Sequence, residues 1–258
     1  NHKVRAKWEQ HAKENGADVI TNSWGDQGGN LYGQLHSTIL EQAIVNAMTQ
    51  GRNGLGCVVI FAAGNFSSTM DYPATFHNDI LTVGSINSNG SRSSSSGYGT
   101  KLDVVAPGNN IISTLPNNTT GSNSGTSMAA PHVAGVAALV ISKNPTFTRW
   151  QVVTAIEATA QKLPTYYFTT VTGHDSSTWN NQVGYGLVDA YAAINHDGGI
   201  VQLFDWTLSS NLTVTGYMVE TKNVTVNNQA KLTIISDKKT TLFQTLNVAS
   251  NSKLEIRN

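Results

Sequence analysis

The sequence predicts an α/β fold in which helices cover both faces of a parallel sheet. Two observations support this. Segments of helical periodicity at 4–15 and 35–49 are each followed by a short strand-like run, at 17–22 and 57–63. The run at 57–63 is apolar without interruption, as is typical of a strand buried on both faces. This alternation is the pattern of parallel α/β units.

Two further strands and two further helices complete the predicted first domain, which we assign to residues 1–197. The turn-forming residues Gly, Asn, Ser and Pro bound the strands, and helical periodicity supports the helices. These elements are expected at 80–83, 102–106, 127–142 and 148–161.

Residues 198–258 are predicted to form a small all-β module, because helical periodicity gives way to short alternating runs. The segment 224–234 is echoed 22 residues later by 246–256, and each copy reads as a strand, an Asn-rich turn and a strand. A fixed period predicts stacked hairpins or the rungs of a β-solenoid. Two copies leave both arrangements open.

The composition argues against several classes of function. Basic and acidic residues number 16 each, and charged residues make up only 12% of the chain, so a nucleic-acid surface is not expected. No apolar run reaches the about 18 residues of a membrane span. Ser, Thr, Asn and Gly supply the polarity, which favours a secreted or cell-surface protein. Cys57 is the only cysteine and is predicted to be buried in its strand.

A candidate nucleophile lies at the start of the helix at 127–142. Residues 125–131 read Gly-Thr-Ser-Met-Ala-Ala-Pro, which places Ser127 on a tight turn at a helix N-terminus. Backbone N–H groups there lack intrahelical acceptors and the helix dipole is positive, so negative charge on a substrate oxygen is stabilised. A serine at this position is also often a simple N-cap, and the spacing alone leaves both roles open.

The segment 125–135 resembles the nucleophile motif of the subtilisin-like serine proteases, the subtilases. Other segments agree with the family in the same order along the chain, so the resemblance covers about residues 4–195. They are 22–25 (Asn-Ser-Trp-Gly), 62–65 (Ala-Ala-Gly-Asn), 72–74 (Tyr-Pro-Ala), 105–108 (Val-Ala-Pro-Gly) and 184–190. The resemblance implies the parallel-sheet, three-layer subtilisin-like fold, incomplete in this chain, for residues 1–197.

The resemblance also implies a serine endopeptidase that hydrolyses peptide bonds through a Ser127 acyl-enzyme. The Asn65 side chain and the Ser127 N–H would stabilise the oxyanion. An extended substrate would pair between two chain edges, and Trp24 and Tyr72 would shape the pocket for the side chain that precedes the cut. The residues implied in substrate binding are Ser23, Trp24, Gly25, Ala62, Ala63, Gly64, Tyr72 and Thr126.

The Asp and His of a subtilase triad are not recognisable in this chain. The family's order is Asp, His, Ser, and none of the 7 histidines is followed by the expected glycine. The chain also begins without an initiator Met or a signal-peptide pattern. We therefore expect a partner, the N-terminal fragment of the same precursor, which would carry the Asp and His after proteolytic processing. In this heterodimer of fragments the partner would also cover the apolar sheet edge beside Val19.

Two other hypotheses stay open. A catalytically inactive subtilase-fold protein, serving binding or structure at the cell surface, would lack the same Asp and His, although it would not need Asn65 or Gly64. In the third hypothesis the module at 198–258 dominates, by attaching the protein to a surface, a glycan or an export apparatus. No cofactor is expected to be required. A structural calcium ion near 97–99 or Asp71 stays open, because no acidic cluster secures it.

Overall fold

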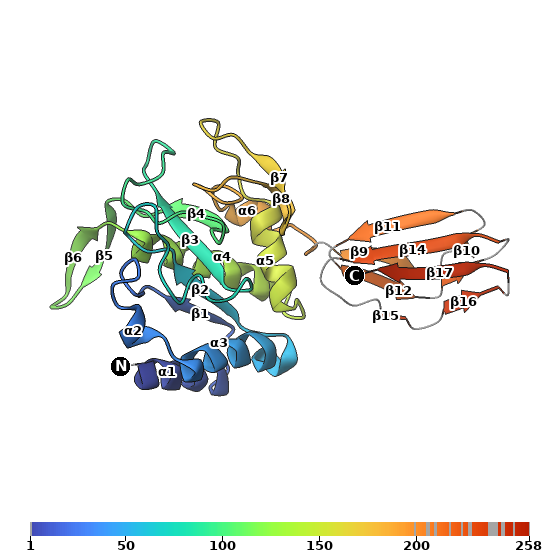
Figure 1. Cartoon of the computed structure of the whole chain (residues 1–258), viewed down its shortest axis with the longest axis horizontal. Coiled ribbons are helices and arrows are strands. Elements are labelled where there is room, and N and C mark those ends of the chain that lie inside the picture. Colours follow the sequence, from blue (N-terminus) through green and yellow to red (C-terminus); the bar gives the residue numbers. More distant parts are fainter. Residues whose placement is uncertain are drawn as a thin grey trace. The chain divides into compact units, whose positions relative to one another are not determined.

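The chain forms two compact units, Asn1–His196 and Asp197–Asn258, which are considered separately below (Figure 1). They are seen in a computed structural model. The residues that it describes are 2–198, 200–204, 207–208, 211–216, 218–222, 224–226, 229–236, 242–243, 246–249 and 251–257.

A four-stranded parallel sheet lies at the centre of the first unit. Its strands are β1 (Val19–Asn22), β2 (Val58–Ala62), β3 (Leu81–Ile86) and β4 (Val104–Pro107), and they lie side by side in chain order. Strands β2 and β3 are buried along their whole length, whereas the edge strand β1 is only partly buried. The predicted α/β fold with a parallel sheet is confirmed.

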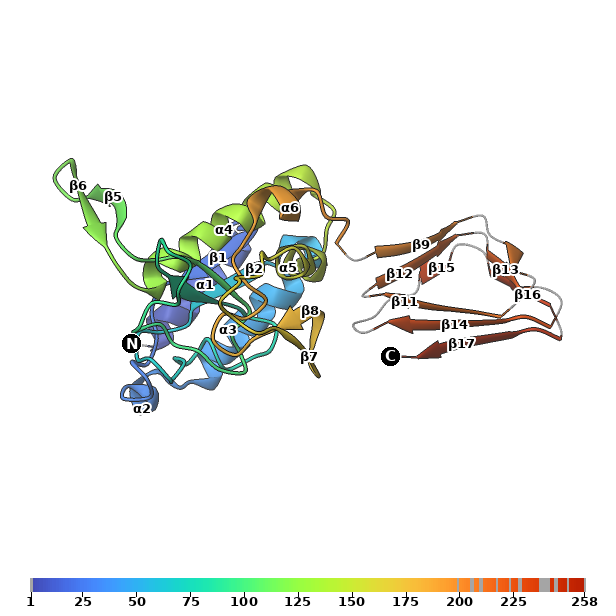
Figure 2. The ribbon, with the colours of Figure 1, turned by 90° about the horizontal axis from the view of Figure 1, so that it is seen from above.

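Helices cover the two faces of this sheet (Figures 1 and 2). One face carries α1 (His2–Glu14), α2 (Tyr32–Leu35) and α3 (Thr38–Gln50). The other carries α4 (Thr126–Lys143), α5 (Arg149–Ala158) and α6 (Ala190–Ile194). The helix predicted at 35–49 corresponds to α3. It begins later than expected, because the chain turns at His36 and Ser37 between α2 and α3. Within the described residues, no helix has the length and hydropathy needed to cross a membrane.

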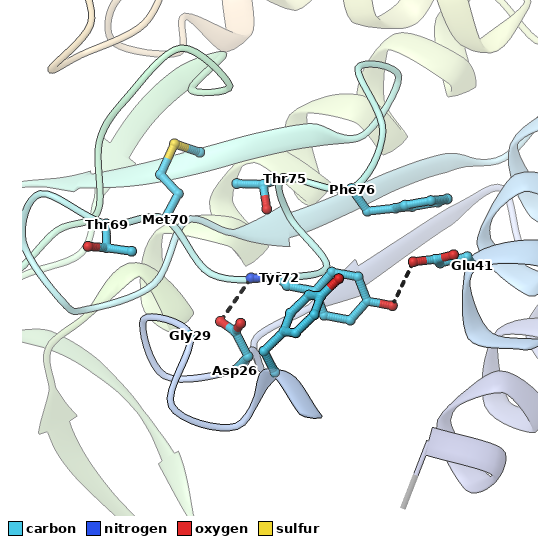
Figure 3. Close-up of a pocket in the computed structure, with 9 residues that line it drawn as sticks. Asp26, Gly29, Glu41, Thr69, Met70, Tyr72, Thr75 and Phe76 are labelled. Carbon is cyan, nitrogen blue, oxygen red and sulfur yellow. Dashed lines mark hydrogen bonds between the residues drawn. The ribbon is translucent and has the colours of Figure 1, made fainter. Parts of the chain in front are cut away.

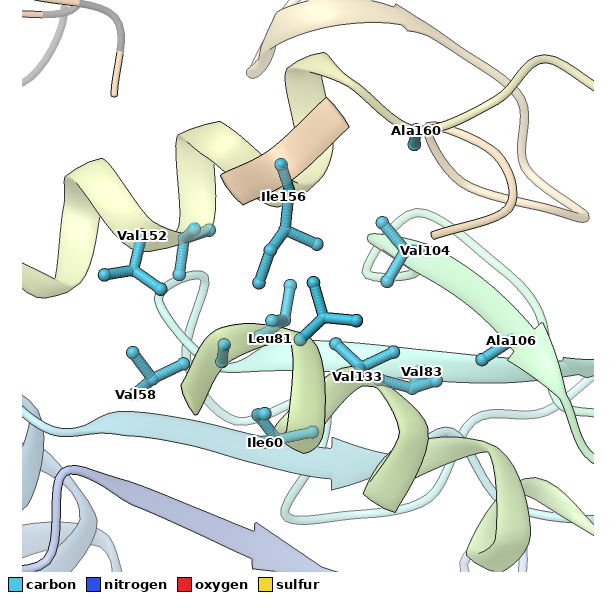
Figure 4. Packing of buried hydrophobic residues seen from close by; sticks show 14 of the residues in the cluster. Val58, Ile60, Leu81, Val83, Val104, Ala106, Val133, Val152, Ile156 and Ala160 are labelled. Atoms are coloured by element: carbon cyan, nitrogen blue, oxygen red, sulfur yellow. The ribbon is translucent and has the colours of Figure 1, made fainter. Parts of the chain in front are cut away.

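Alternate residues of β2 divide between two hydrophobic cores. Val58 and Ile60 face α4 and α5 in the core shown in Figure 4, while Val59 and Phe61 face α1 and α3. Successive strand residues point to opposite faces, so a strand covered on both sides needs an uninterrupted apolar run. This requirement explains the composition of residues 57–63.

The remaining elements of the first unit are short and lie outside the sheet. A 3₁₀ turn (η1, Arg52–Gly54) follows α3. A hairpin of β5 (Ile111–Leu115) and β6 (Thr119–Asn123) connects β4 to α4 and projects from the unit (Figure 2). A second hairpin is made by β7 (Thr169–Val171) and β8 (His174–Trp179). Neither hairpin was expected from the sequence.

Every element that the structure describes in the second unit is a strand. The strands pair in three parallel sheets with the orders β15-β12-β9, β10-β13-β16 and β11-β14-β17. Val224 pairs with Leu246 and Lys231 pairs with Lys253, which reproduces the 22-residue repeat. Neighbouring strands pair in parallel at offsets of 18, 20 or 22 residues, which is the arrangement of solenoid rungs rather than of stacked hairpins. The bounds are β9 (Ile200–Phe204), β10 (Thr207–Leu208), β11 (Leu212–Gly216), β12 (Met218–Lys222), β13 (Val224–Val226), β14 (Lys231–Ser236), β15 (Leu242–Phe243), β16 (Leu246–Val248) and β17 (Lys253–Arg257).

The burial of β2 predicts a large difference between two chemically identical substitutions. Ile60 is fully buried, whereas Ile112 on the β5–β6 hairpin is 75% exposed. Ile60→Ala should lower the free energy of unfolding by about 2–5 kcal/mol, because it leaves a cavity between the sheet and α4. Ile112→Ala should change it by less than about 0.5 kcal/mol. Urea denaturation followed by tryptophan fluorescence measures both, and equal losses would contradict the two-sided burial of β2.

Candidate active site

A cavity of about 510 Å³ lies where the carboxyl ends of β1 and β2 meet the N-terminus of α4. Because β1 and β2 are adjacent parallel strands, the segments that follow them emerge at the same edge of the sheet. The cavity is lined by Arg5, Ser23, Trp24, Gly25, Gln27, Leu31, Ala62, Gly64, Asn65, Phe66, Asp71, Thr126 and Ser127.

Ser127 is the second residue of α4 and is half-buried in this cavity. Its N–H falls in the first helical turn, where backbone donors have no intrahelical acceptor. The preceding Gly125 has φ 144°, which strongly favours glycine, and its N–H donates to the Gly108 carbonyl at 2.7 Å. Ser23 Oγ donates to the Ser127 carbonyl oxygen at 2.9 Å. The Gly125 contact ties the start of α4 to the segment after β4, and the Ser23 contact ties it to the segment after β1.

The orientation of the Asn65 side chain is fixed by Thr126. The Thr126 backbone N–H donates to Asn65 Oδ1 at 3.0 Å, and Thr126 Oγ1 lies within hydrogen-bonding distance of the same oxygen at 3.2 Å. A backbone N–H can only donate, so the atom that faces it must be the amide oxygen. The NH₂ group of Asn65 is therefore the end that is left for a ligand, on a side chain that is exposed to solvent.

Thr126 also binds the end of β2. Its hydroxyl oxygen accepts a hydrogen bond from the Gly64 N–H at 3.2 Å, and the Thr126 residue is completely buried. Gly64 has φ 97°, and a Cβ atom there would lie 2.5 Å from the carboxyl carbon of Asp71. Only glycine fits this turn, and the turn brings Asn65 to the start of α4.

The two chain edges expected to hold a substrate differ in their free backbone groups. No hydrogen bond between described backbone groups uses the N–H or C=O of Trp24 or Gly25. Ala63, in contrast, donates to Val83 and accepts from Asp71, while the Gly64 carbonyl accepts from Gly97. The edge after β1 is therefore open to pairing, and the edge after β2 can serve only as a wall.

Most residues predicted for the site are brought together, but Ala63 and Tyr72 are not. Ala63 is fully buried and does not line the cavity. Tyr72 lines a neighbouring cavity of about 370 Å³ with Asp26 and Glu41 (Figure 3). Its hydroxyl donates to Glu41 Oε1 at 3.3 Å, and burial raises the Tyr72 pKa above its ordinary value. Its side chain therefore contacts the α3 side of the unit instead of the Ser127 cavity.

Arg5 and Asp71 line the cavity although the sequence did not assign either of them to the substrate site. The Arg5 guanidinium carbon lies 4.1 Å from the centre of the Trp24 ring, a cation–π contact. The only signal for Asp71 in the sequence is its position directly before the Tyr-Pro-Ala segment at 72–74. Its side-chain position follows from the turn at Gly64, which the sequence alone does not fix.

No histidine lines the cavity in the part of the chain that the structure describes. His132 lies one turn further along α4, with Nδ1 2.8 Å from the Met128 carbonyl oxygen, and it is exposed. His36 pairs with Glu41 at 3.3 Å, and the His174 ring stacks on Trp179. Ser127 Oγ has no hydrogen-bond partner among the described residues. These residues also contain no group of three His, Cys, Asp or Glu side chains arranged for a metal ion, so calcium stays an untested prediction.

Buried polar atoms gather beside the cavity, between α1 and the edge strand β1. Arg5 Nη1, Glu9 Oε2 and Asn22 Nδ2 are enclosed without a well-formed hydrogen bond to any described residue. Burial raises the pKa of Glu9 to about 7, although the nearby Asn22 amide opposes this shift in part. An unsatisfied buried polar group costs about 1–3 kcal/mol, so this edge is energetically unfavourable as it stands.

Comparisons with known proteins agree on one family. The family model described as "Subtilase family" matches residues 2–186. The chain is 43% identical over 157 residues to Subtilisin DY of Bacillus licheniformis, covering 59% of this chain and 53% of that protein. It is 44% identical over 162 residues to Subtilisin amylosacchariticus of Bacillus subtilis subsp. amylosacchariticus, covering 61% and 39%. The chain thus spans about half or less of the length of these relatives.

Two solved structures are similar to the chain. The prenylagaramide maturation protease PagA gives a TM-score of 0.59 at 28% identity and covers 75% of this chain and 66% of its own. A protease from Pseudoalteromonas arctica gives a TM-score of 0.58 at 31% identity, with coverages of 73% and 57%.

The raised pKa of Glu9 predicts how stability depends on pH. The folded-state pKa of about 7 lies above the ordinary 4.5, so the folded protein holds this proton more tightly than the unfolded chain. The contribution is fully present below pH 4.5 and is lost as pH rises through 7, by up to about 3 kcal/mol. Glu9→Gln should remove this loss and make the 258-residue chain more stable than the parent at pH 8.

Urea denaturation at pH 4.5 to 8 measures the difference within the window set by these values. Glu14→Gln is the matched control, because it removes the same charge from an exposed position of the same helix. A parent and a Glu9→Gln variant with the same pH dependence would contradict an enclosed Glu9 carboxyl that holds its proton in the folded chain.

Proposed function

The chain belongs to the subtilase family, and on that premise we propose that it carries the nucleophile and oxyanion site of a serine endopeptidase. The observation that supports this most is the arrangement of Asn65 and Ser127 on one cavity. Thr126 holds the Asn65 oxygen and leaves the NH₂ group exposed, on the same cavity as Ser127, whose N–H has no hydrogen-bond partner among the described residues. Two donors placed in this way suit an oxygen that becomes negative during peptide hydrolysis.

The proposed reaction begins when a base, which we place on the partner fragment below, takes the proton of Ser127 Oγ and this oxygen attacks the carbonyl carbon of the peptide bond. The carbonyl oxygen takes up negative charge and receives hydrogen bonds from Asn65 Nδ2 and the Ser127 N–H. Collapse of this intermediate breaks the C–N bond, the base returns its proton to the leaving amine, and the acyl group left on Ser127 is then hydrolysed by water. Because Asn65 is already held in place, its amide needs no reorganisation as the charge develops.

The proposed substrate is an extended polypeptide. The unpaired backbone groups of Trp24 and Gly25 are suited to bind it as an added strand on one side. Gly25 has no side chain to keep the substrate backbone away, and Ala62 and Gly64 form the opposing wall. Substrate therefore gains main-chain hydrogen bonds along one edge only.

The base that activates Ser127 is proposed to come from the N-terminal fragment of the same precursor. A serine without a base is a weak nucleophile, and the cavity offers no histidine within the described residues. Edge strand β1 pairs only with β2 in the described sheet, and the unsatisfied atoms of Arg5, Glu9 and Asn22 lie beside it. A strand added there would supply partners for these atoms and cover the edge.

Exposed apolar side chains on α1 support the same proposal. Trp8 is 73% exposed and Val4 also lies in solvent. We propose that the fragment contacts these residues, so that the working protein is a non-covalent heterodimer of fragments. Its Ser-, Thr- and Asn-rich composition favours secretion or a place at the cell surface.

A catalytically inactive binding or structural protein is the second candidate. The absence of a histidine from the cavity, as far as the chain is described, favours it. The hydrogen bonds that hold the Asn65 side chain favour the enzyme instead, because a binding protein has no use for an oxyanion site. The reactivity of Ser127 distinguishes the two candidates.

A fluorophosphonate probe tests the completed site. We expect it to label Ser127 when the upstream part of the precursor is present, and to leave the isolated 258-residue chain unlabelled. Ser127→Ala in the two-chain complex is the matched control and should not be labelled. Mass spectrometry of the labelled peptide identifies the residue. No labelling of the complex would favour the inactive protein, and equal labelling of the isolated chain would remove the need for a fragment.

Asn65→Asp tests the oxyanion role with little change of shape. The aspartate keeps an oxygen for both bonds from Thr126 but replaces the NH₂ donor by a second oxygen, which repels a developing negative charge. The kcat of the two-chain complex should fall by at least about 10²–10³, the range known for loss of one such donor in a subtilisin, while KM and Tm stay near the parent values. An unchanged kcat would remove Asn65 from the mechanism.

A further inference from the structure

Asp71 places a carboxyl group in the same cavity as Ser127. Its backbone N–H donates to the Ala63 carbonyl at 2.9 Å, which fixes the residue beside the end of β2. Only 7% of Asp71 is exposed. The side chain is therefore a built part of the cavity rather than a surface group.

The carboxyl group lies between the two chain edges of the proposed substrate site. A Cβ atom added to Gly25 would lie 2.4 Å from Asp71 Oδ2, and one added to Gly64 would lie 2.5 Å from Asp71 Oδ1. Gly25 belongs to the edge that is open to pairing, and Gly64 belongs to the opposing wall. A side chain that enters between these edges meets the Asp71 carboxyl.

The carboxyl group is held in place, but no described residue forms an ion pair with it. Asp71 Oδ1 accepts a hydrogen bond from the Gly28 N–H at 2.7 Å. The pKa of Asp71 is raised overall, chiefly by burial and also by the nearby Asp26, although hydrogen bonds from Gly28 and Gln27 oppose the shift. Arg5 lies elsewhere on the cavity and stacks on Trp24.

We propose that Asp71 makes this site selective for a basic side chain, arginine or lysine, directly before the cleaved bond. This selectivity rests on the function proposed above, and it further assigns the cavity between Gly25 and Gly64 to that side chain. A guanidinium or ammonium group supplies a cation in a site of low dielectric, where the attraction is strong. A large apolar side chain would instead remove water from the carboxylate without replacing its hydrogen bonds.

The charge contribution can be isolated with product peptides, which bind without needing the catalytic base. The probes are four acetylated tetrapeptides that differ only in the C-terminal residue, which is arginine, citrulline, phenylalanine or alanine. Citrulline has the shape of arginine without its charge. Isothermal titration calorimetry with the 258-residue chain should give an affinity for the arginine peptide at least about tenfold above that for the citrulline peptide.

Asp71→Asn should reduce this ratio to about twofold or less, because the amide keeps the size of the side chain and loses its charge. Glu41→Gln is the control variant. It removes the same charge from the neighbouring cavity, where Glu41 binds the Tyr72 hydroxyl, and should leave the ratio unchanged. Circular dichroism checks that each variant is folded.

The outcomes separate this inference from the proposed function. Equal binding of the arginine and citrulline peptides, tighter binding of the phenylalanine or alanine peptide, or no binding of any of them would overturn the role of Asp71. Cleavage by the two-chain complex after residues other than arginine or lysine would also overturn it while leaving the protease proposal intact. Charge-selective binding that depends on Asp71, in a complex that neither hydrolyses peptides nor reacts with a phosphonate, would retain the pocket and contradict the protease.

Discussion

The candidate site depends on hydrogen bonds that Thr126 makes in two directions. Its hydroxyl oxygen accepts from Gly64 at the end of β2, and its N–H donates to the oxygen of the Asn65 side chain. One buried residue thereby joins the start of α4 to the sheet and sets the direction of an amide beside Ser127. Gly64 and Gly125 flank these bonds, and both have positive φ angles that a residue with a side chain rarely adopts. A side chain at either position would therefore disturb the whole arrangement.

The edge strand β1 is the place where the proposed partner fragment would bind. The segment after this strand contains Trp24 and Gly25, whose backbone groups are unpaired within the described residues. Atoms of Arg5, Glu9 and Asn22 that lack a well-formed hydrogen bond to any described residue lie between α1 and the strand. A polypeptide that paired with β1 would lie close to the cavity, because the cavity begins at the carboxyl end of this strand. The same physical need, a partner for buried polar groups, thus joins the stability of the first unit to the proposed supply of a base for Ser127.

Much of the fold could be predicted from the sequence, because burial on both faces gives the central strands a recognisable apolar composition. The unbroken apolar run at 57–63 is required by burial on both faces, and the 22-residue repeat reappears in the register of β14 with β17. The β5–β6 hairpin could not be predicted, because its Ser- and Thr-rich strands are exposed on both faces and show no alternation. The motifs also could not reveal that Tyr72 lies on a different cavity from Ser127 and that Asp71 lies on the same one. That depends on the turn at Gly64.

The central claim is that Asn65 and the N-terminus of α4 together bind a negatively charged oxygen next to Ser127. The most direct measurement is a crystal structure of the two-chain complex after reaction with a peptidyl phosphonate. The account predicts a phosphonyl oxygen about 2.7–3.1 Å from both Asn65 Nδ2 and the Ser127 N, with Thr126 still donating to Asn65 Oδ1. A phosphonyl oxygen bound by other groups, or an Asn65 side chain turned away from the adduct, would contradict it.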